Sequence, residues 1–184
     1  MDLQKFKGRK ILLGVCSSIA AYKAVDLVST LVKAGAEVRV IMTKNASKII
    51  SERVFATVSR NAVCVDMWER IDDWKPEHIS LAQFAELFIV APATANTIGN
   101  FANGLAPDML SSTYLATKAK VLIAPAMNDA MYSHPAVQKN IETLKSFGVS
   151  FVEPEDGMLA CGTCGKGRLA GLDLILSRAA ELLW

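Results

Sequence analysis

Cys161 and Cys164 form a C-x-x-C pair within the glycine-rich segment 157–168. Such a pair can act as a redox dithiol or supply half of the ligands of a structural zinc site. A structural zinc needs further ligands, and the other cysteines and both histidines lie far from this pair in the sequence, so we predict no metal site. A third interpretation is that Cys161 alone takes part in chemistry and Cys164 is incidental.

Two further side chains are of types that bind or move protons on small molecules, His78 and Asn128. His78 follows a polar stretch at the predicted start of a helix, and a histidine can accept a proton near neutral pH; a surface or capping role fits equally well. Asn128 lies in a loop after a predicted strand, where its amide could bind a carboxylate or simply form a turn. For His134, between a serine and a proline, we expect a structural role.

An apolar run that meets a proline lies in the middle of the chain, at residues 87–97, LFIVAPATANT. Its unbroken apolar character predicts a strand buried on both faces, as in a parallel sheet. Pro92 cannot donate a hydrogen bond to a sheet and is expected to end the strand. Thr94, Asn96 and Thr97 then open a helix, whose unpaired N–H groups favour an anion. Because ligands of open α/β sheets bind beyond the carboxyl ends of the strands, we expect a ligand at this turn.

The first part of the chain predicts a βαβ unit, with strands at residues 10–15 and 37–42 on either side of a helix. Ser17 and Ser18 follow the first strand, where they could cap the helix and donate to a phosphate. An ordinary serine cap without a ligand fits this position equally well. Thr43 follows the second strand at its carboxyl end and could reach the same ligand. The first turn contains no G-x-G-x-x-G, so a Rossmann dinucleotide site is not supported.

A second strand that meets a proline at its end is predicted at residues 121–124, which suggests that two neighbouring strands open into one crevice. The segment 157–168 contains four glycines. Their backbone freedom argues against the interior of a strand or helix and favours a flexible lid. The alternation of predicted strands and helices indicates an α/β domain with a parallel central sheet.

The composition is that of one globular domain: 184 residues, of which 52% are hydrophobic, with a net charge of +2. Charges are spread along the chain, which gives no electrostatic case for nucleic acid, and no apolar run is long enough to cross a membrane. The basic N-terminus resembles a signal peptide, but the apolar run after it is short and continues as an amphipathic helix. We expect a cytoplasmic protein with reduced thiols.

A resemblance to a known family rests on five segments: SSIAAYK at 17–23, HISLA at 78–82, APATANT at 91–97, PAMNDAMY at 125–132 and LACGTCGKGR at 159–168. Through them the chain resembles the homo-oligomeric flavin-containing cysteine decarboxylases. This resemblance implies a flavodoxin-like (Rossmann-like) three-layer α/β/α fold that binds FMN and forms trimers or larger assemblies of trimers, up to a dodecamer. It implies a single flavoprotein decarboxylase domain over residues 1–184, with a substrate flap at about 157–168 and the flavin site at a subunit interface.

The resemblance also implies roles for individual residues. His78 would be the active-site base, Asn128 would hold the substrate carboxylate, and Cys161 would return a proton. The substrate would be contacted by Asn128, Met131, Ala160, Cys161 and Gly162. The implied FMN contacts are Ser17, Ser18, Ile19, Thr43, Thr94, Ala95, Asn96, Thr97 and Ala126.

The implied reaction is decarboxylation of 4'-phosphopantothenoyl-L-cysteine to 4'-phosphopantetheine in coenzyme A biosynthesis. A cysteine carboxylate cannot lose CO2 directly, since the carbanion would have no electron sink; FMN supplies one by accepting electrons from the carbon–sulfur end. Alternatives are a peptidyl-cysteine decarboxylase of lantibiotic maturation, a flavin prenyltransferase, and a non-catalytic flavoprotein regulatory subunit. Cys161 in the flap argues against the peptidyl-cysteine decarboxylase. The combination of Cys161, His78 and the PAMN loop argues against the prenyltransferase, and the presence of His78 argues against the non-catalytic subunit.

Four positions depart from the family pattern. Ser17 and Ser18 stand where many relatives have two glycines, and Tyr132 stands where a Trp is common. Pro107 is unusual beside Asp108, so we leave Asp108 out of the predicted site.

Overall fold

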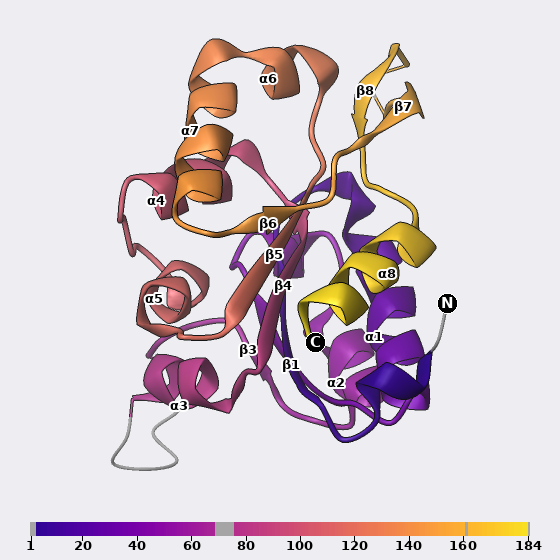
Figure 1. The fold of residues 1–184 in the computed structure, drawn as a ribbon, viewed down its shortest axis with the longest axis vertical. Coiled ribbons are helices and arrows are strands. Elements are labelled where there is room, and N and C mark those ends of the chain that lie inside the picture. The colour runs from indigo at the N-terminus through magenta and orange to yellow at the C-terminus, as the bar shows by residue number, and fades with distance from the viewer. Residues whose placement is uncertain (1–2, 69–75, 161, 184) are drawn as a thin grey trace.

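A six-stranded parallel sheet forms the centre of the protein, with strand order β3-β2-β1-β4-β5-β6 (Figure 1). The structure is a computed structural model and describes residues 3–68, 76–160 and 162–183. The strands are β1 (Lys10–Val15), β2 (Glu37–Met42), β3 (Val63–Cys64), β4 (Leu87–Ala93), β5 (Lys120–Pro125) and β6 (Ser150–Phe151). The predicted parallel α/β fold is therefore confirmed.

Helices cover both faces of this sheet and complete a three-layer α/β/α arrangement (Figure 1). One face packs against α1 (Lys23–Lys33), α2 (Glu52–Ser59) and α8 (Leu172–Leu182). The other packs against α3 (Glu77–Phe84), α4 (Ala95–Ala102), α5 (Met109–Ala116) and α7 (Pro135–Ser146). The short helical segments are η1 (Leu3–Phe6), η2 (Ile19–Tyr22), η3 (Ala46–Lys48) and α6 (Asp129–Ser133).

The central strands are apolar because both of their faces are covered. Every residue of β4 is buried, and β1 is buried from Ile11 to Val15. Alternate side chains of a strand point to opposite faces, so Leu87 and Ile89 join the core beneath α1 and α8 while Phe88 and Val90 join the core beneath α5 and α7. This two-sided burial explains the continuous apolar run that the sequence shows at β4.

The strand order reverses between β1 and β4. The chain runs outward from β1 through β2 to β3, returns to β4 beside β1, and then runs outward the other way through β5 to β6. The connections that follow β1 and β4 therefore diverge to opposite faces of the sheet. Such a reversal opens a crevice at the carboxyl ends of the two strands, where open α/β sheets bind their ligands.

Strand β4 continues through Pro92 to Ala93, so the prediction that Pro92 ends the strand is wrong by one residue. The pairing of β4 with β5 shifts register between Val90 and Ala93, and a proline is tolerated at such an irregularity because no ladder hydrogen bond needs its missing N–H. The Pro92 carbonyl accepts a hydrogen bond from the Cys16 N–H at 3.2 Å. This contact links the turn after β4 to the turn after β1.

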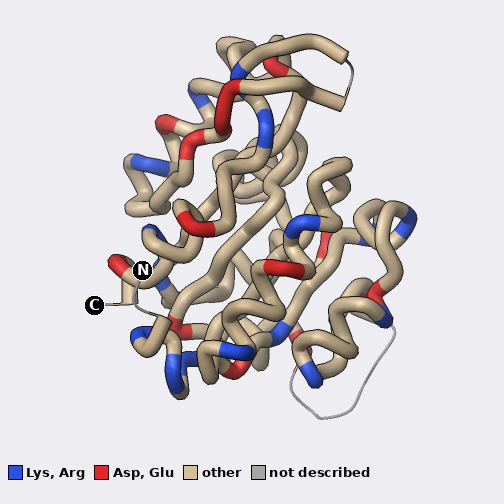
Figure 2. The backbone as a smooth tube through the Cα atoms, turned by 90° about the vertical axis from the view of Figure 1, so that its right-hand side faces the viewer, with Lys and Arg blue, Asp and Glu red and all other residues tan. Residues whose placement is uncertain are grey.

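Basic and acidic residues are interspersed along the backbone (Figure 2). Within the described ranges, no helix is long and apolar enough to cross a membrane. The same part of the chain contains no group of three or more His, Cys, Asp or Glu side chains that could hold a metal ion.

Candidate functional site

A cavity of about 580 Å³ lies beyond the carboxyl ends of β1, β4 and β5. Its wall is built from the turns that follow these three strands and from an antiparallel hairpin, β7 (Glu155–Met158) and β8 (Cys164–Arg168). Figure 1 shows this hairpin and α6 together at the end of the sheet where the strands finish. The volume is within the range of small-molecule and cofactor pockets.

The turn after β1 supplies one side of the cavity. Ser18 caps η2, and its hydroxyl accepts a hydrogen bond from the Ala20 N–H at 3.4 Å. Ser17 is exposed at the cavity and makes no hydrogen bond to another described residue, so its polar groups can serve a ligand. Ile19 and Tyr22 are 64% and 60% exposed although both line the cavity. Apolar side chains this exposed around a pocket indicate a surface that a ligand or another chain covers.

Buried hydrogen bonds fix the turn after β4 to the end of β1. Thr94 caps α4 and accepts a hydrogen bond from the Thr97 N–H at 3.4 Å. The Thr97 hydroxyl donates to the Cys16 sulfur at 3.2 Å, and Cys16 is fully buried. Burial raises the pKa of the Cys16 thiol to about 11, so it stays protonated at neutral pH. Thr97 therefore stabilises the wall from inside rather than presenting its hydroxyl to the cavity.

The loop after β5 carries Asn128 into the cavity lining. Its side-chain oxygen accepts hydrogen bonds from the Ala130 N–H at 2.9 Å and the Met131 N–H at 3.3 Å, which makes Asn128 the N-cap of α6. The predicted turn-forming role is thus present. The cap occupies the oxygen of the amide, and the other end of the side chain is an NH2 group, a donor of the kind that a carboxylate accepts. Both roles are compatible in one side chain.

The hairpin β7–β8 lies directly against this loop. The Gly167 carbonyl accepts a hydrogen bond from the Met127 N–H at 3.0 Å. A Cβ at Gly167 would lie 2.1 Å from the Met127 carbonyl oxygen, and one at Gly165 would lie 2.7 Å from the Asp129 side chain. The prediction that the glycines exclude strand structure is wrong. They occur in a strand because it approaches another backbone more closely than a side chain would allow.

Gly167→Ala is expected to destabilise the protein by about 2 kcal/mol, because the added methyl group must displace β8 from the Met127 carbonyl. The midpoint and slope of urea unfolding measure this. Gly99→Ala is the matched control: its Cβ would meet Asn140 at an ordinary 3.5 Å, and alanine is the better helix former in α4. Equal stability of the Gly167→Ala variant and the wild type would contradict the close approach.

The structure brings many of the predicted site residues together and leaves others apart. Thr43 does not line the cavity, and its hydroxyl accepts a hydrogen bond from the Ala46 N–H at 3.2 Å. Asn96 is exposed outside the cavity, and neither Thr97 nor Gly162 lines it. Cys161 lies outside the described residues. The predicted residues that do line the cavity are Ser17, Ser18, Ile19, Thr94, Ala95, Ala126, Asn128, Met131 and Ala160.

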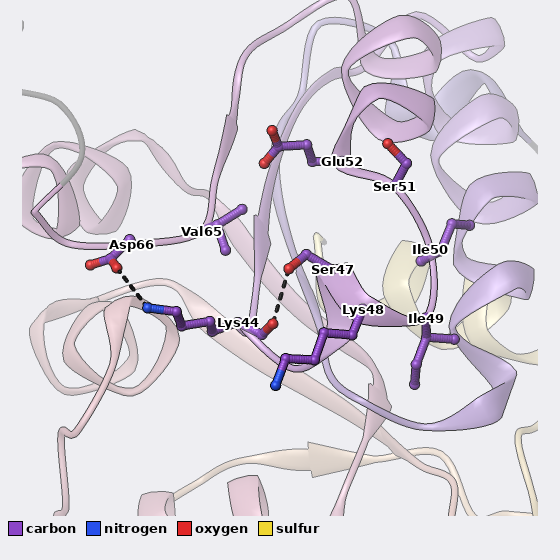
Figure 3. Close-up of a pocket in the computed structure, with 9 residues that line it drawn as sticks. All are labelled: Lys44, Ser47, Lys48, Ile49, Ile50, Ser51, Glu52, Val65 and Asp66. Carbon is purple, nitrogen blue, oxygen red and sulfur yellow. Dashed lines mark hydrogen bonds and ion pairs between the residues drawn. The ribbon is translucent and has the colours of Figure 1, made fainter.

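A second cavity of about 400 Å³ follows Thr43, beyond β2 and β3 (Figure 3). The Lys44 ammonium and the Asp66 carboxylate form an ion pair at 3.4 Å there, and the Ser47 hydroxyl donates to the Lys44 carbonyl (Figure 3). It shares no lining residue with the first cavity. We therefore place the site at the first cavity, where the predicted residues converge.

His78 is half-buried in the first turn of α3 and does not line the cavity of its own chain. The neighbouring Glu77 accepts a hydrogen bond from the Cys64 thiol at 2.8 Å, so this end of α3 adjoins the edge strand β3. His134 caps α7 through its Nδ1, as its expected structural role requires, and Asp108 caps α5. One chain alone therefore does not combine His78 with Asn128.

Sequence reasoning missed several residues of the cavity, among them Met158, Leu159 and Lys23. It also missed Glu153, which contacts Tyr132 and Lys166 beside the cavity. The sequence did single out Tyr132, because it departs from the family pattern. It gave no reason to single out Glu153, which is a lone glutamate before a glycine-rich segment.

A model of the flavoprotein family matches residues 2–183, almost the whole chain. The protein belongs to the flavoprotein family. Its cavity fits a flavin in size, in its small lining side chains (Ala20, Ala95 and Ala126) and in its exposed apolar walls, with Ser17 ready to donate a hydrogen bond. Ser17, Ser18 and Thr94 would hold the polar parts of the group.

Two curated relatives of this flavoprotein differ in length. It is 52% identical over 173 residues to the coenzyme A biosynthesis bifunctional protein CoaBC of Bacillus subtilis, covering 94% of this chain and 43% of that protein. It is 43% identical over 177 residues to a probable phosphopantothenoylcysteine decarboxylase of Streptococcus mutans, covering 95% of this chain and 99% of that one. The chain thus spans less than half of the bifunctional relative.

Solved structures agree with the flavodoxin-like fold of this flavoprotein. The FMN-dependent cysteine decarboxylase SpaF is 32% identical, with a TM-score of 0.85 over 97% of this chain and 98% of that one. A cysteine-to-serine mutant of PPC decarboxylase complexed with pantothenoylaminoethenethiol is 30% identical, with a TM-score of 0.84 over 94% and 96%. The fold implied by the family resemblance is confirmed.

Proposed function

We propose that this flavoprotein catalyses the FMN-dependent decarboxylation of 4'-phosphopantothenoyl-L-cysteine to 4'-phosphopantetheine in coenzyme A biosynthesis. The observation that carries the proposal is one cavity in which the turns suited to a flavin meet the Asn128 loop and the glycine-rich hairpin. The full-length match to the Streptococcus mutans protein, whose name gives this activity, supports the choice of substrate.

Each proposed catalytic or binding residue has a separate role in the reaction. Asn128 donates its side-chain NH2 to the substrate carboxylate, which makes binding depend on an unesterified carboxyl group. Met131 and Ala160 flank the same space, and the hairpin excludes water from it. Bound FMN would supply a reversible two-electron acceptor for the carbon–sulfur end of the substrate. His78 takes a proton as the base, and Cys161 returns one as the acid.

The domain, assembly and location form part of the same proposal. We infer one decarboxylase domain over residues 1–184 that forms a homotrimer, or larger assemblies of trimers, in the cytoplasm. Support for an assembly comes from His78, which does not line the cavity of its own chain, and from the exposed Ile19, Tyr22 and Met131 at the cavity. A neighbouring chain that covers these side chains would bring its own His78 to the site.

The purified protein is expected to be yellow and to release FMN, not FAD, on acid treatment. Incubation with 4'-phosphopantothenoyl-L-cysteine should yield 4'-phosphopantetheine with loss of CO2, as mass spectrometry detects. A colourless protein that does not take up added FMN would contradict the cofactor, and unreacted substrate in the presence of bound FMN would contradict the reaction.

A second candidate is decarboxylation of a peptide that ends in cysteine, favoured by the likeness to the solved peptidyl-cysteine decarboxylase EpiD. The same assay separates the two when a peptide with a C-terminal cysteine is supplied in place of the pantothenoyl substrate. Turnover of the peptide alone would replace the proposed substrate while leaving the chemistry intact.

Cys161→Ser is expected to release CO2 but to accumulate an oxidised product, because serine is far too weak an acid to return the proton. Mass spectrometry should show a product two hydrogens lighter than 4'-phosphopantetheine. Cys164→Ser is the matched control and should give the ordinary product. The ordinary product from the Cys161→Ser variant would remove Cys161 from the reaction.

A further inference from the structure

A single carboxylate joins the hairpin to the helical turn that begins at Asn128. Glu153 lies between β6 and β7, and its Oε2 accepts a hydrogen bond from the Tyr132 hydroxyl at 2.5 Å. The same oxygen accepts a hydrogen bond from the Lys166 ammonium of β8 at 3.0 Å. On its other side, Oε1 lies 3.8 Å from the Lys145 ammonium of α7. Three separate elements thus meet at one acidic side chain.

Both short contacts of Glu153 lead back to the cavity. Tyr132 is only 7% exposed, and its N–H donates to the Asn128 carbonyl at 2.9 Å within α6. Lys166 precedes Gly167, which lines the cavity and whose carbonyl accepts from the Met127 N–H. Glu153 therefore connects the Asn128 turn and the strand that lies over it.

The protonation states at neutral pH suit this bridge. The hydrogen bond from Tyr132 lowers the pKa of Glu153, and burial raises the pKa of Tyr132 above its ordinary value. Glu153 is therefore charged and Tyr132 is protonated, which gives a charge-assisted hydrogen bond, stronger than a neutral one. The Lys166 ammonium also lies 5.6 Å from the centre of the Tyr132 ring, within range of a cation–π contact.

The hairpin needs such a bridge because the sheet does not hold it. Among the described strands, β7 and β8 pair only with each other, and a lone two-stranded hairpin is marginally stable in water. At its base, Glu155 accepts hydrogen bonds from Arg168 and from the Gly171 N–H, both at 2.7 Å, which closes the hairpin on its own connection. Contacts to residues 127–132 attach it to the cavity wall, among them the hydrogen bond between Met127 and Gly167 and the close approach of Gly165 to Asp129.

We propose that Glu153 is a positioning residue that holds the hairpin β7–β8 against α6 and so sets the space in which Asn128 meets the substrate. Glu153 is not among the described residues that line the cavity, and it acts through Tyr132 and Lys166. The kinetic part of this inference rests on the function proposed above, whereas the attachment of the hairpin does not.

Three variants separate the parts of the bridge. Glu153→Gln keeps an acceptor for Tyr132 but removes the charge, Tyr132→Phe keeps the buried ring but removes the hydroxyl, and Lys166→Met removes the ammonium. Glu181→Gln is the matched control, because it breaks a similar 2.7 Å ion pair with Arg178 on α8, away from the cavity.

Hydrogen exchange of the amides of residues 155–168, measured on the flavin-loaded protein without substrate, is expected to be about tenfold faster in Glu153→Gln and Tyr132→Phe. KM for 4'-phosphopantothenoyl-L-cysteine should rise about tenfold, with kcat within about twofold of wild type. Flavin content should stay unchanged, and Glu181→Gln should match the wild type in every measurement.

The inference would be overturned if the hairpin amides of both Glu153→Gln and Tyr132→Phe exchanged at the same rate as in the wild-type protein. Faster exchange accompanied by a loss of kcat at constant KM would also overturn it, since a positioning role in binding predicts the reverse. If Glu153→Gln does not fold, Tyr132→Phe decides the question, because it removes one hydrogen bond and retains the packed ring. A wild-type protein without decarboxylase activity would contradict only the proposed function, and the exchange measurement would still decide the role of Glu153.

Discussion

Asn128→Asp is expected to lower the rate of CO2 release about a thousandfold while the fold and the bound flavin are retained. Aspartate is as good an N-cap as asparagine, so its carboxylate can accept the same hydrogen bonds from the Ala130 and Met131 N–H groups. It replaces the NH2 donor with a second negative oxygen, which repels the substrate carboxylate. Turnover with the purified, flavin-loaded variant measures the loss.

The comparison with Asn128→Ala makes this prediction specific. Alanine removes both the cap and the donor, so this variant should lose about 1 kcal/mol of stability as well as activity. Asn128→Asp should unfold at nearly the wild-type urea concentration. Near-normal turnover by Asn128→Asp would show that the side chain serves only as a cap, and loss of flavin would show that its role lies in the cofactor pocket.

His78→Asn is expected to lower CO2 release by at least a hundredfold without loss of flavin, because asparagine cannot accept the proton. The side chains proposed to hold the flavin are Ser17, Ser18 and Thr94, which the variant leaves unchanged, so the flavin should remain bound. His134→Asn is the matched control: asparagine is a good N-cap for α7, and activity should stay within about twofold of wild type. Retained turnover in His78→Asn would refute its role as the base.

Subunit mixing tests whether His78 serves the cavity of a neighbouring chain. Co-expression of His78→Asn and Asn128→Asp chains with different tags allows mixed assemblies to be purified. If each site of a trimer combines the cavity of one chain with His78 of another, every mixed trimer keeps one intact site, and about a third of wild-type activity should return in the purified mixed assemblies. No recovery in mixed assemblies would contradict a site shared between chains.

The sequence alone determined the elements whose cause is local. The apolar run at residues 87–93 forms the fully buried β4, and Ser18 and Thr94 cap the segments that follow their strands. Such features depend on side-chain polarity and backbone preferences over a few residues, which a sequence displays directly. The motifs at residues 17–23, 91–97 and 125–132 also indicated the family, and all three contribute to one cavity.

Contacts between distant segments were decided only by the tertiary structure. Thr97 carries the hydroxyl expected of a ligand contact, yet it donates to Cys16, far away in the sequence. The glycines at 165 and 167 look like marks of flexibility, yet they belong to a strand pressed against Met127 and Asp129. The physical reason is the same in each case. Each of these contacts joins residues from separate elements, such as the Thr97 hydroxyl and the Cys16 sulfur or the β8 backbone and Met127. They depend on how those elements pack in three dimensions. A local pattern of residues does not encode which distant segment will lie within contact distance.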